Sequence, residues 1–162
     1  LAVTFSADGR RFTVVNNHFS SRSGSTHVFG AVHPFVQEGE EEREAQSRAV
    51  HDWVTHRLDE RPEMPVLVAG DLNTFEFTDD LSRILPGEGD EGILTNLLRQ
   101  VPEDERYTYI FEGNSQALDH IFVSRDVADG ARVDVVHLNS IFSYGGRAAS
   151  DHDPVVASVP LP

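Results

Sequence analysis

Four short polar segments stand next to apolar, strand-like runs, and they contain the residue types that hydrolytic chemistry needs. They are NNH at 16–18, GDLN at 70–73, LDH at 118–120 and SDHDP at 150–154. A residue at the end of a buried strand is held rigidly, which suits a catalytic group. Taken alone, GDLN is more often an ordinary turn, and SDHDP could be a polar turn before an edge strand, because Asp and Asn bond readily to nearby backbone. Together they supply the Asp, His and Asn side chains of a metal-assisted phosphoryl-transfer site.

The spacing inside two of these segments suggests how their side chains are shared out. Asp71 and Asn73 are two residues apart, so in extended backbone they would face the same way and could grip one ligand. Asp151 and His152 are adjacent, so their side chains would diverge. That arrangement suits a carboxylate turned to a hard cation and an imidazole turned to substrate or water.

The elements that must position these segments are predicted to be strands interrupted by helices. Strands at 2–5 and 12–15 would form a hairpin around Asp8-Gly9, and a buried strand at 65–69 would deliver Asp71 to its carboxyl end. An amphipathic helix is predicted over 40–58, where the acidic start suits the helix dipole and needs no ligand. Short helices are expected at 78–85 and 93–101, with later strands at 107–111, 118–124, 133–138 and 155–159. The fold class is therefore mixed α/β.

The composition limits the function further. The 162 residues contain 13 Lys and Arg against 27 Asp and Glu, a net charge of −14, so a broad basic surface for nucleic acid is excluded. If phosphate is the substrate, another group must supply positive charge. The absence of Cys excludes disulfides and thiolate sites, and no apolar run is long enough for a membrane span. The first residues do not have the order of a signal peptide.

The four segments together resemble the endonuclease/exonuclease/phosphatase superfamily, which includes the pancreatic-type deoxyribonucleases. VVNNHFSSR is similar to its histidine-bearing strand and VAGDLNTFE to its Gly-Asp-Phe-Asn motif. ALDHIFVS is similar to its Asp-bearing strand, and SDHDPVV to its final Ser-Asp-His motif. The sequences EREAQSRAVHDWV and RYTYIFEGNSQALDHI most resemble those of bacterial predicted extracellular nucleases. The resemblance covers about residues 2–159 and implies part of a DNase I-like four-layer α/β/β/α sandwich.

One element of the family pattern is missing. The family carries a metal-binding Glu on an earlier strand and loop, and nothing before His18 matches it. Residues 1–162 therefore resemble the C-terminal portion of one such domain. A domain without its first portion would expose a sheet edge and apolar surface, for which pairing with a second copy is a remedy.

The resemblance implies a role for each matched residue. His152 would be the general base, or would align the attacking water, and Asp119 would orient and stabilise its imidazole. Asp71 would position the water and Asn73 would donate to a phosphate oxygen. His18 would act as a second acid or as a donor to the phosphate. Asp151 would bind the cation, for which Mg²⁺ is expected and Ca²⁺ or Mn²⁺ are alternatives, and Asn16 or Asn17 could contribute.

The predicted function is metal-dependent hydrolysis of phosphodiesters, with a nuclease acting on DNA or RNA as the first hypothesis. A phosphatase or phospholipid phosphodiesterase of the same superfamily is the second, because loops decide the substrate. A non-catalytic binding module or an inactive fragment is the alternative from another class, since the metal-binding Glu is missing. An extracellular or cell-surface location of the parent protein follows from the resemblance alone.

Several other residues are interpreted as structural. Five histidines have no partner at ligand spacing and are expected to be at the surface or satisfied: His27, His33, His51, His56 and His137. His120 is expected to point away from Asp119. The alternating Tyr107, Tyr109 and Phe111 favour core or sheet-face positions, with a ring that stacks on a base as the alternative. Arg22 and Arg147 are expected in solvated loops, with a phosphate contact as the alternative.

Overall fold

The structure is a computed structural model that describes residues 1–27, 30–89, 92–141 and 149–162. Its largest sheet has the strand order β1-β2-β3-β7-β4. The strands are β1 (Ala2–Ala7), β2 (Arg10–His18), β3 (Val66–Asp71), β7 (Asp119–Ser124) and β4 (Leu94–Asn96). β2 and β3 run parallel, and every other neighbouring pair in this sheet is antiparallel. Three of the four segments predicted to carry chemistry thus meet within one sheet, and the fourth, at 150–154, precedes a strand of another sheet.

The first hairpin forms as the sequence predicts. Asp8 and Gly9 both have positive φ, at 50° and 80°, which is the turn geometry that Asp and Gly tolerate. β1 lies at the edge of the sheet and all six of its residues are exposed. Phe5, for example, is 47% exposed although its ring stacks on Phe12. The chain therefore has an unprotected edge strand with apolar side chains.

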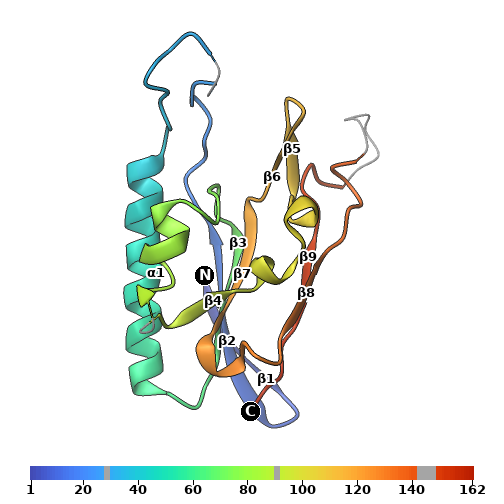
Figure 1. Ribbon diagram of the computed structural model, residues 1–162. Coiled ribbons are helices and arrows are strands. Elements are labelled where there is room, and N and C mark those ends of the chain that lie inside the picture. The colour runs from blue at the N-terminus through green and yellow to red at the C-terminus, as the bar shows by residue number, and fades with distance from the viewer. Residues whose placement is uncertain (28–29, 90–91, 142–148) are drawn as a thin grey trace.

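One helix covers one face of the sheet (Figure 1). This helix, α1 (Glu40–Glu60), confirms the prediction over 40–58. Its fully buried Val54 belongs to the same core as Val66 and Val68 of β3. Leu81 and Leu85, from the short helix η1 (Asp80–Ile84) and the residue after it, complete this core. The helix is thus fastened to the strand that carries Asp71.

A second core lies on the opposite face of the sheet. Leu67 of β3 and Ile121 of β7, which alternate with the first-core residues, pack there against a cluster that includes Val127, the last residue of the turn η5 (Arg125–Val127). Val133 and Ala157 extend this core from a small antiparallel sheet, β8 (Arg132–Val135) and β9 (Val155–Ser158). Helix, main sheet and small sheet are stacked in that order (Figure 1). This is the α/β/β part of the expected sandwich.

The predicted helix at 93–101 is wrong in its first half. Leu94–Asn96 forms β4 and pairs with Phe122–Ser124 of β7, because the open edge of β7 offers hydrogen bonds that local propensity does not anticipate. The Asn96 side chain then accepts from the Leu98 amide and starts the 3-10 turn η3 (Leu97–Gln100). No helix among the described residues combines the length and apolarity needed to cross a membrane.

A further hairpin stands at the end of the sheet where β3 ends and β7 begins. The predicted strand at 107–111 is shorter than expected, as β5 (Tyr109–Phe111), and it pairs with β6 (Asn114–Gln116). A 3-10 turn, η4 (Glu103–Glu105), precedes it. The polypeptide passes from β6 almost directly into β7, so the hairpin is attached to the strand that begins with Asp119.

Candidate active site

Strand pairing places three of the predicted site residues side by side at one end of the main sheet. His18, the last residue of β2, is the register partner of Asp71, the last residue of β3. Asp71 is in turn the register partner of Asp119, the first residue of β7. Neighbouring strands lie about 4.8 Å apart, so this register alone brings the three side chains within reach of one ligand.

The glycine of the GDLN segment allows this close approach. Gly70 has φ +138°, and a Cβ at this position would lie 1.9 Å from the carbonyl oxygen of Asn17. Only glycine therefore fits between the ends of β2 and β3. The motif contains a structural residue next to a chemical one, and replacement of Gly70 would push the strand ends apart.

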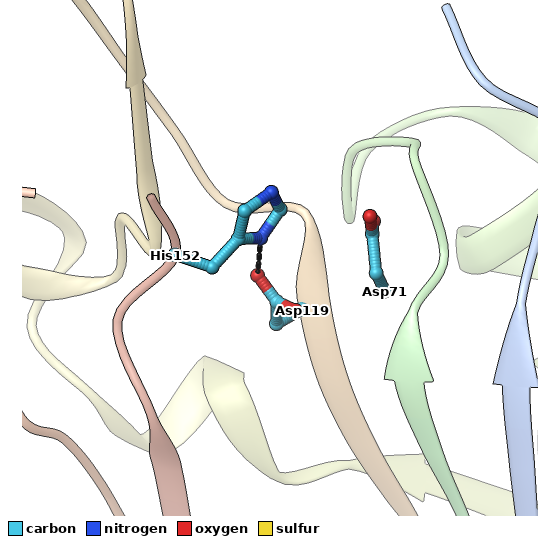
Figure 2. Close-up of side chains that lie close together, drawn as sticks. All are labelled: Asp71, Asp119 and His152. Atoms are coloured by element: carbon cyan, nitrogen blue, oxygen red, sulfur yellow. Dashed lines mark hydrogen bonds and ion pairs between the residues drawn. The ribbon is translucent and has the colours of Figure 1, made fainter. Parts of the chain in front are cut away.

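His152 reaches the same site from the segment that leads into β9. Its Nδ1 donates a hydrogen bond of 2.6 Å to Oδ2 of Asp119, and both side chains are about one-fifth exposed (Figure 2). This hydrogen bond raises the pKa of His152, and the charges of Asp119, Asp71 and Asp151 act in the same direction against partial burial. With Nδ1 engaged, the Nε2 atom is the one available to exchange a proton with substrate or water.

Asp71 and Asn73 come together in a turn, and the expected extended backbone is not formed. Asn73 has φ +51°, a left-handed conformation that Asn tolerates, and its backbone amide donates to Oδ1 of Asp71 at 2.9 Å. The Asn73 side-chain amide donates to Oδ2 of Asp71 at 3.2 Å and to the carbonyl oxygen of Phe19 at 3.1 Å. Asn73 thus holds the Asp71 carboxylate in place, and its predicted contact with phosphate would require one of these bonds to be released.

The Asp71 carboxylate is not fully compensated. Burial raises its pKa, the nearby charge of Asp119 adds to this, and the Asn73 amide and the two histidines oppose it. His18 is mostly exposed, and its Nε2 lies 3.5 Å from Oδ2 of Asp71. A partly buried carboxylate beside a second carboxylate favours binding of a cation between them.

Three side chains could hold that cation. Asp71, Asp119 and His152 each offer a ligand atom, and these atoms lie within 4.8 Å of one another. Mg²⁺ prefers carboxylate oxygens, whereas imidazole nitrogen suits transition metals better. Because the His152 ring is already bonded to Asp119, the carboxylates are the better fit to Mg²⁺. Asp151 is exposed and does not belong to this group, so its role as the metal ligand stays a prediction.

Two other residues considered in the sequence analysis, His120 and Arg22, are not part of the group formed by Asp71, Asp119 and His152. His120 is buried on the face of β7 opposite Asp119, where it contacts Asn96 Nδ2 at 3.2 Å and the Thr74 carbonyl oxygen at 3.1 Å, as expected. Burial lowers the pKa of His120, which suits a neutral core histidine. Arg22 lies with its guanidinium 4.4 Å from the centre of the Phe75 ring. Arg147 lies outside the described residues.

Two residues that support the site are not among those predicted from the sequence. Asp153 is buried and binds His137, and Thr108 is buried beneath the pair formed by Asp119 and His152. A second Asp directly after Asp-His was a visible signal for the first of these. No pattern in the sequence indicates the contacts of Thr108, because they are made with residues that are distant along the chain.

Comparisons with known proteins identify the family and the fold of the chain. The sequence matches the model of the Endonuclease/Exonuclease/phosphatase family over residues 5–152. Among curated proteins, none matches the chain. Truncated TDP2 from Caenorhabditis elegans is similar in structure, with a TM-score of 0.68 and 18% identity over 98% of this chain and 58% of that chain.

Two further solved structures share the fold. Sphingomyelinase C from Streptomyces griseocarneus has a TM-score of 0.62 and 23% identity over 96% of this chain and 56% of that one. The mannosyl-6-phosphatase of Bacteroides thetaiotaomicron has a TM-score of 0.62 and 18% identity over 94% of this chain and 52% of that one. The chain thus spans about half the length of the structures that it matches.

Proposed function

Because the chain belongs to the endonuclease/exonuclease/phosphatase family, we propose that it hydrolyses phosphodiester bonds and that its substrate is a nucleic acid. The observation that carries this proposal is the 2.6 Å hydrogen bond between His152 and Asp119, formed beside Asp71. His152 would act as the base and Asp119 orients it, while Asp71 could bind a cation beside them. This arrangement suits metal-assisted hydrolysis of a phosphate ester.

The proposed reaction uses each residue at a stated atom. Nε2 of His152 takes a proton from water while the water oxygen attacks phosphorus. The phosphorus–oxygen bond to the leaving group breaks, and the leaving oxygen receives a proton from His18 or from solvent. Asp119 stabilises the imidazolium that forms, and Asp71, fixed by Asn73, orients the attacking water.

None of the residues assigned to these roles is a lysine or an arginine, and the net charge of the chain is −14. In the proposed function the carboxylates of Asp71 and Asp119 would hold Mg²⁺, with Ca²⁺ or Mn²⁺ as the alternatives, and the exposed Asp151 would contribute to the same cation. A divalent cation at this position supplies the positive charge that the phosphoryl oxygens need in the transition state. The acidic site thereby becomes suitable for an anionic substrate.

A phosphatase or a phospholipid phosphodiesterase is the second candidate. It is supported by the structural similarity to the sphingomyelinase and to the mannosyl-6-phosphatase, each with a TM-score of 0.62 against 0.68 for TDP2. A third candidate, a binding module or inactive fragment, rests on the missing upstream Glu. We also propose that residues 1–162 are the C-terminal portion of one domain and that the parent protein is extracellular. A further proposal is that two copies of the chain pair along the exposed edge strand β1. Sedimentation would show a single 18.0 kDa species if the chain does not pair.

The test compares three substrates with and without metal. The chain with Mg²⁺ should degrade plasmid DNA or RNA, and should leave sphingomyelin and a sugar phosphate intact. Removal of the metal with a chelator should abolish the reaction, and Asp71→Asn should lower the rate by about 100-fold. Asp79→Asn is the control, because Asp79 is an exposed acid paired with Arg83 and lies outside the site. Hydrolysis of sphingomyelin or sugar phosphate alone would replace the nuclease assignment, and no hydrolysis of any substrate would favour the binding module.

A further inference from the structure

His152 needs a second constraint in addition to its hydrogen bond with Asp119. The residue lies outside any strand, three residues before β9 begins at Val155, and Nδ1 is its only ring atom that is hydrogen-bonded among the described residues. A ring held at one atom can still tilt about that bond, and such a tilt would move Nε2 away from the attacking water.

Tyr109 provides that constraint through the face of its ring. The ring centres of Tyr109 and His152 are 4.8 Å apart and the planes are inclined by 27°, which is a stacked arrangement. Tyr109 is the first residue of β5 and pairs with Gln116 of β6, so its backbone is fixed by the hairpin. The Asp119 bond therefore fixes the imidazole within its plane, and the tyrosine face limits its tilt.

Thr108, the preceding residue, connects the backbones of both partners. Its hydroxyl oxygen accepts from the amides of Leu118 and Asp119, at 3.1 and 3.2 Å. Its carbonyl oxygen accepts from the amide of Asp153, the residue after His152, at 2.7 Å. The side chain of Thr108 is fully buried, so water does not compete for these bonds. A single residue thus sets the separation between the Asp119 backbone and the His152 backbone.

We propose that Thr108 and Tyr109 form a positioning unit for the catalytic pair, in which Thr108 sets the spacing of the two backbones and Tyr109 sets the tilt of the His152 ring. The proposal rests on the proposed function, because it assumes that His152 acts as the base. Neither residue takes part in proton transfer itself. Their contribution is to kcat, since a tilted imidazole still permits substrate binding but no longer aligns the water.

A direct measurement of the pair separates this inference from the activity. In the 162-residue chain, proton NMR should detect a downfield Nδ1–H resonance of His152, identified by its loss in His152→Ala. Tyr109→Ala should broaden or remove this resonance and lower kcat by up to about 100-fold, with KM changed by less than about threefold. Tyr109→Phe keeps the flat ring and should restore both the resonance and most of kcat.

Phe111→Ala is the matched control. Phe111 lies on the same short strand and stacks on Tyr109 with ring centres 6.3 Å apart, so its removal disturbs the hairpin to a similar extent. This variant should keep the resonance and kcat. Equal losses in Tyr109→Ala and Phe111→Ala, or a wild-type resonance and kcat in Tyr109→Ala, would overturn the proposal.

Two safeguards keep the outcomes distinct. If Tyr109→Ala is unfolded at the assay temperature, Tyr109→Met keeps more of the apolar contact than Ala without a flat face, and it should show the same losses. Thr108→Val removes the hydroxyl acceptor at nearly constant volume and should also weaken the resonance, whereas Thr108→Ser should retain it. If the wild-type chain hydrolyses no phosphodiester, the proposed function fails, while the resonance of each variant still decides whether the positioning unit exists.

Discussion

Two histidine–aspartate pairs lie next to each other in this chain, and they differ in what else holds the carboxylate. His152 bonds Asp119 at 2.6 Å, and His137 bonds Asp153 at 3.0 Å. Each imidazole also stacks on a tyrosine of one short segment. Tyr109 lies 4.8 Å from His152, and Tyr107 lies 4.1 Å from His137 between ring centres. The local geometry of the pairs is therefore similar.

Their surroundings are not similar. The Asp153 side chain is completely buried, and it accepts hydrogen bonds from the backbone amides of Leu138, Asn139 and Ser140 and from the Ser140 hydroxyl. Burial alone would raise the pKa of Asp153, but the bonds from Ser140, His137 and the amides outweigh it and lower the pKa to about 2. This pair fastens Asp153, the residue after His152, to the segment that follows β8.

The Asp119 carboxylate, in contrast, has His152 as its hydrogen-bond partner among the described residues and lies beside Asp71. The outer nitrogens of the two rings differ in the same way. Nε2 of His137 is buried at 3.2 Å from Glu105 Oε2, a distance suited to an ion pair, but without the angle of a hydrogen bond. A histidine–aspartate pair is thus structural where other hydrogen bonds occupy the carboxylate oxygens, as in Asp153. It is suited to chemistry where the carboxylate and the outer ring nitrogen are left accessible, as in Asp119 and His152.

The largest expected difference between the pairs is in catalysis. His152→Ala should lower kcat for plasmid or oligonucleotide hydrolysis by about 1000-fold, because the general base is removed. His137→Ala should keep kcat within about fivefold, provided that the assay is run well below its unfolding midpoint. Steady-state rates of the two purified variants check this. Similar losses in both would show that the two pairs work as one catalytic unit.

The second expected difference is in stability, where substitution in the pair of His137 and Asp153 should have the larger effect. Asp153→Asn should lower the free energy of unfolding by about 3 kcal/mol, because a buried carboxylate that accepts several hydrogen bonds is replaced by a group that cannot accept them all. Asp119→Asn should cost less than about 1 kcal/mol, since that side chain is partly exposed. Urea unfolding of both variants measures the difference, and an equal cost would remove the distinction between the pairs.

The sequence predicts the pair of His152 and Asp119 and does not predict the pair of His137 and Asp153, and the reason is physical. His152 and Asp119 stand at strand ends within motifs, and register brings such ends together. Asp153 also stands in a motif, but its partners are backbone amides at 138–140, and no side-chain pattern marks which amides point inward. The same limit explains why a helix was expected at 93–101, where pairing with β7 decides the local structure. Patterns of side chains identify candidate functional groups. They do not predict backbone hydrogen bonds between residues that are far apart in the sequence.

The stability contributed by the Asp153 carboxylate should depend on pH. The pKa of Asp153 is lowered from 3.8 to about 2, so its ionised form contributes about 2 kcal/mol of stability above pH 4. A lowered pKa means that this contribution is lost as pH falls through the folded-state value. The stability difference between wild type and Asp153→Asn, measured by urea unfolding, should therefore shrink by about 2 kcal/mol between pH 5 and pH 2. A difference that stays constant over this range would mean that the carboxylate is not preferentially ionised in the folded state.

The smallest expected effect is a shift in the pH dependence of the rate. The pKa of His152 is raised, chiefly by its hydrogen bond with Asp119, so the neutral base becomes available only above the ordinary histidine value of 6.5. The acid limb of kcat/KM should therefore lie above pH 6.5, and the rate should rise with pH through it. Asp119→Asn removes the charge and should move the limb about one pH unit lower, which corresponds to about 1.4 kcal/mol. Asp153→Asn should leave the limb in place, because Asp153 faces His137. An unmoved limb in Asp119→Asn would assign the titration to a group other than His152, and an equal shift in both variants would mean that the two carboxylates act on the same imidazole.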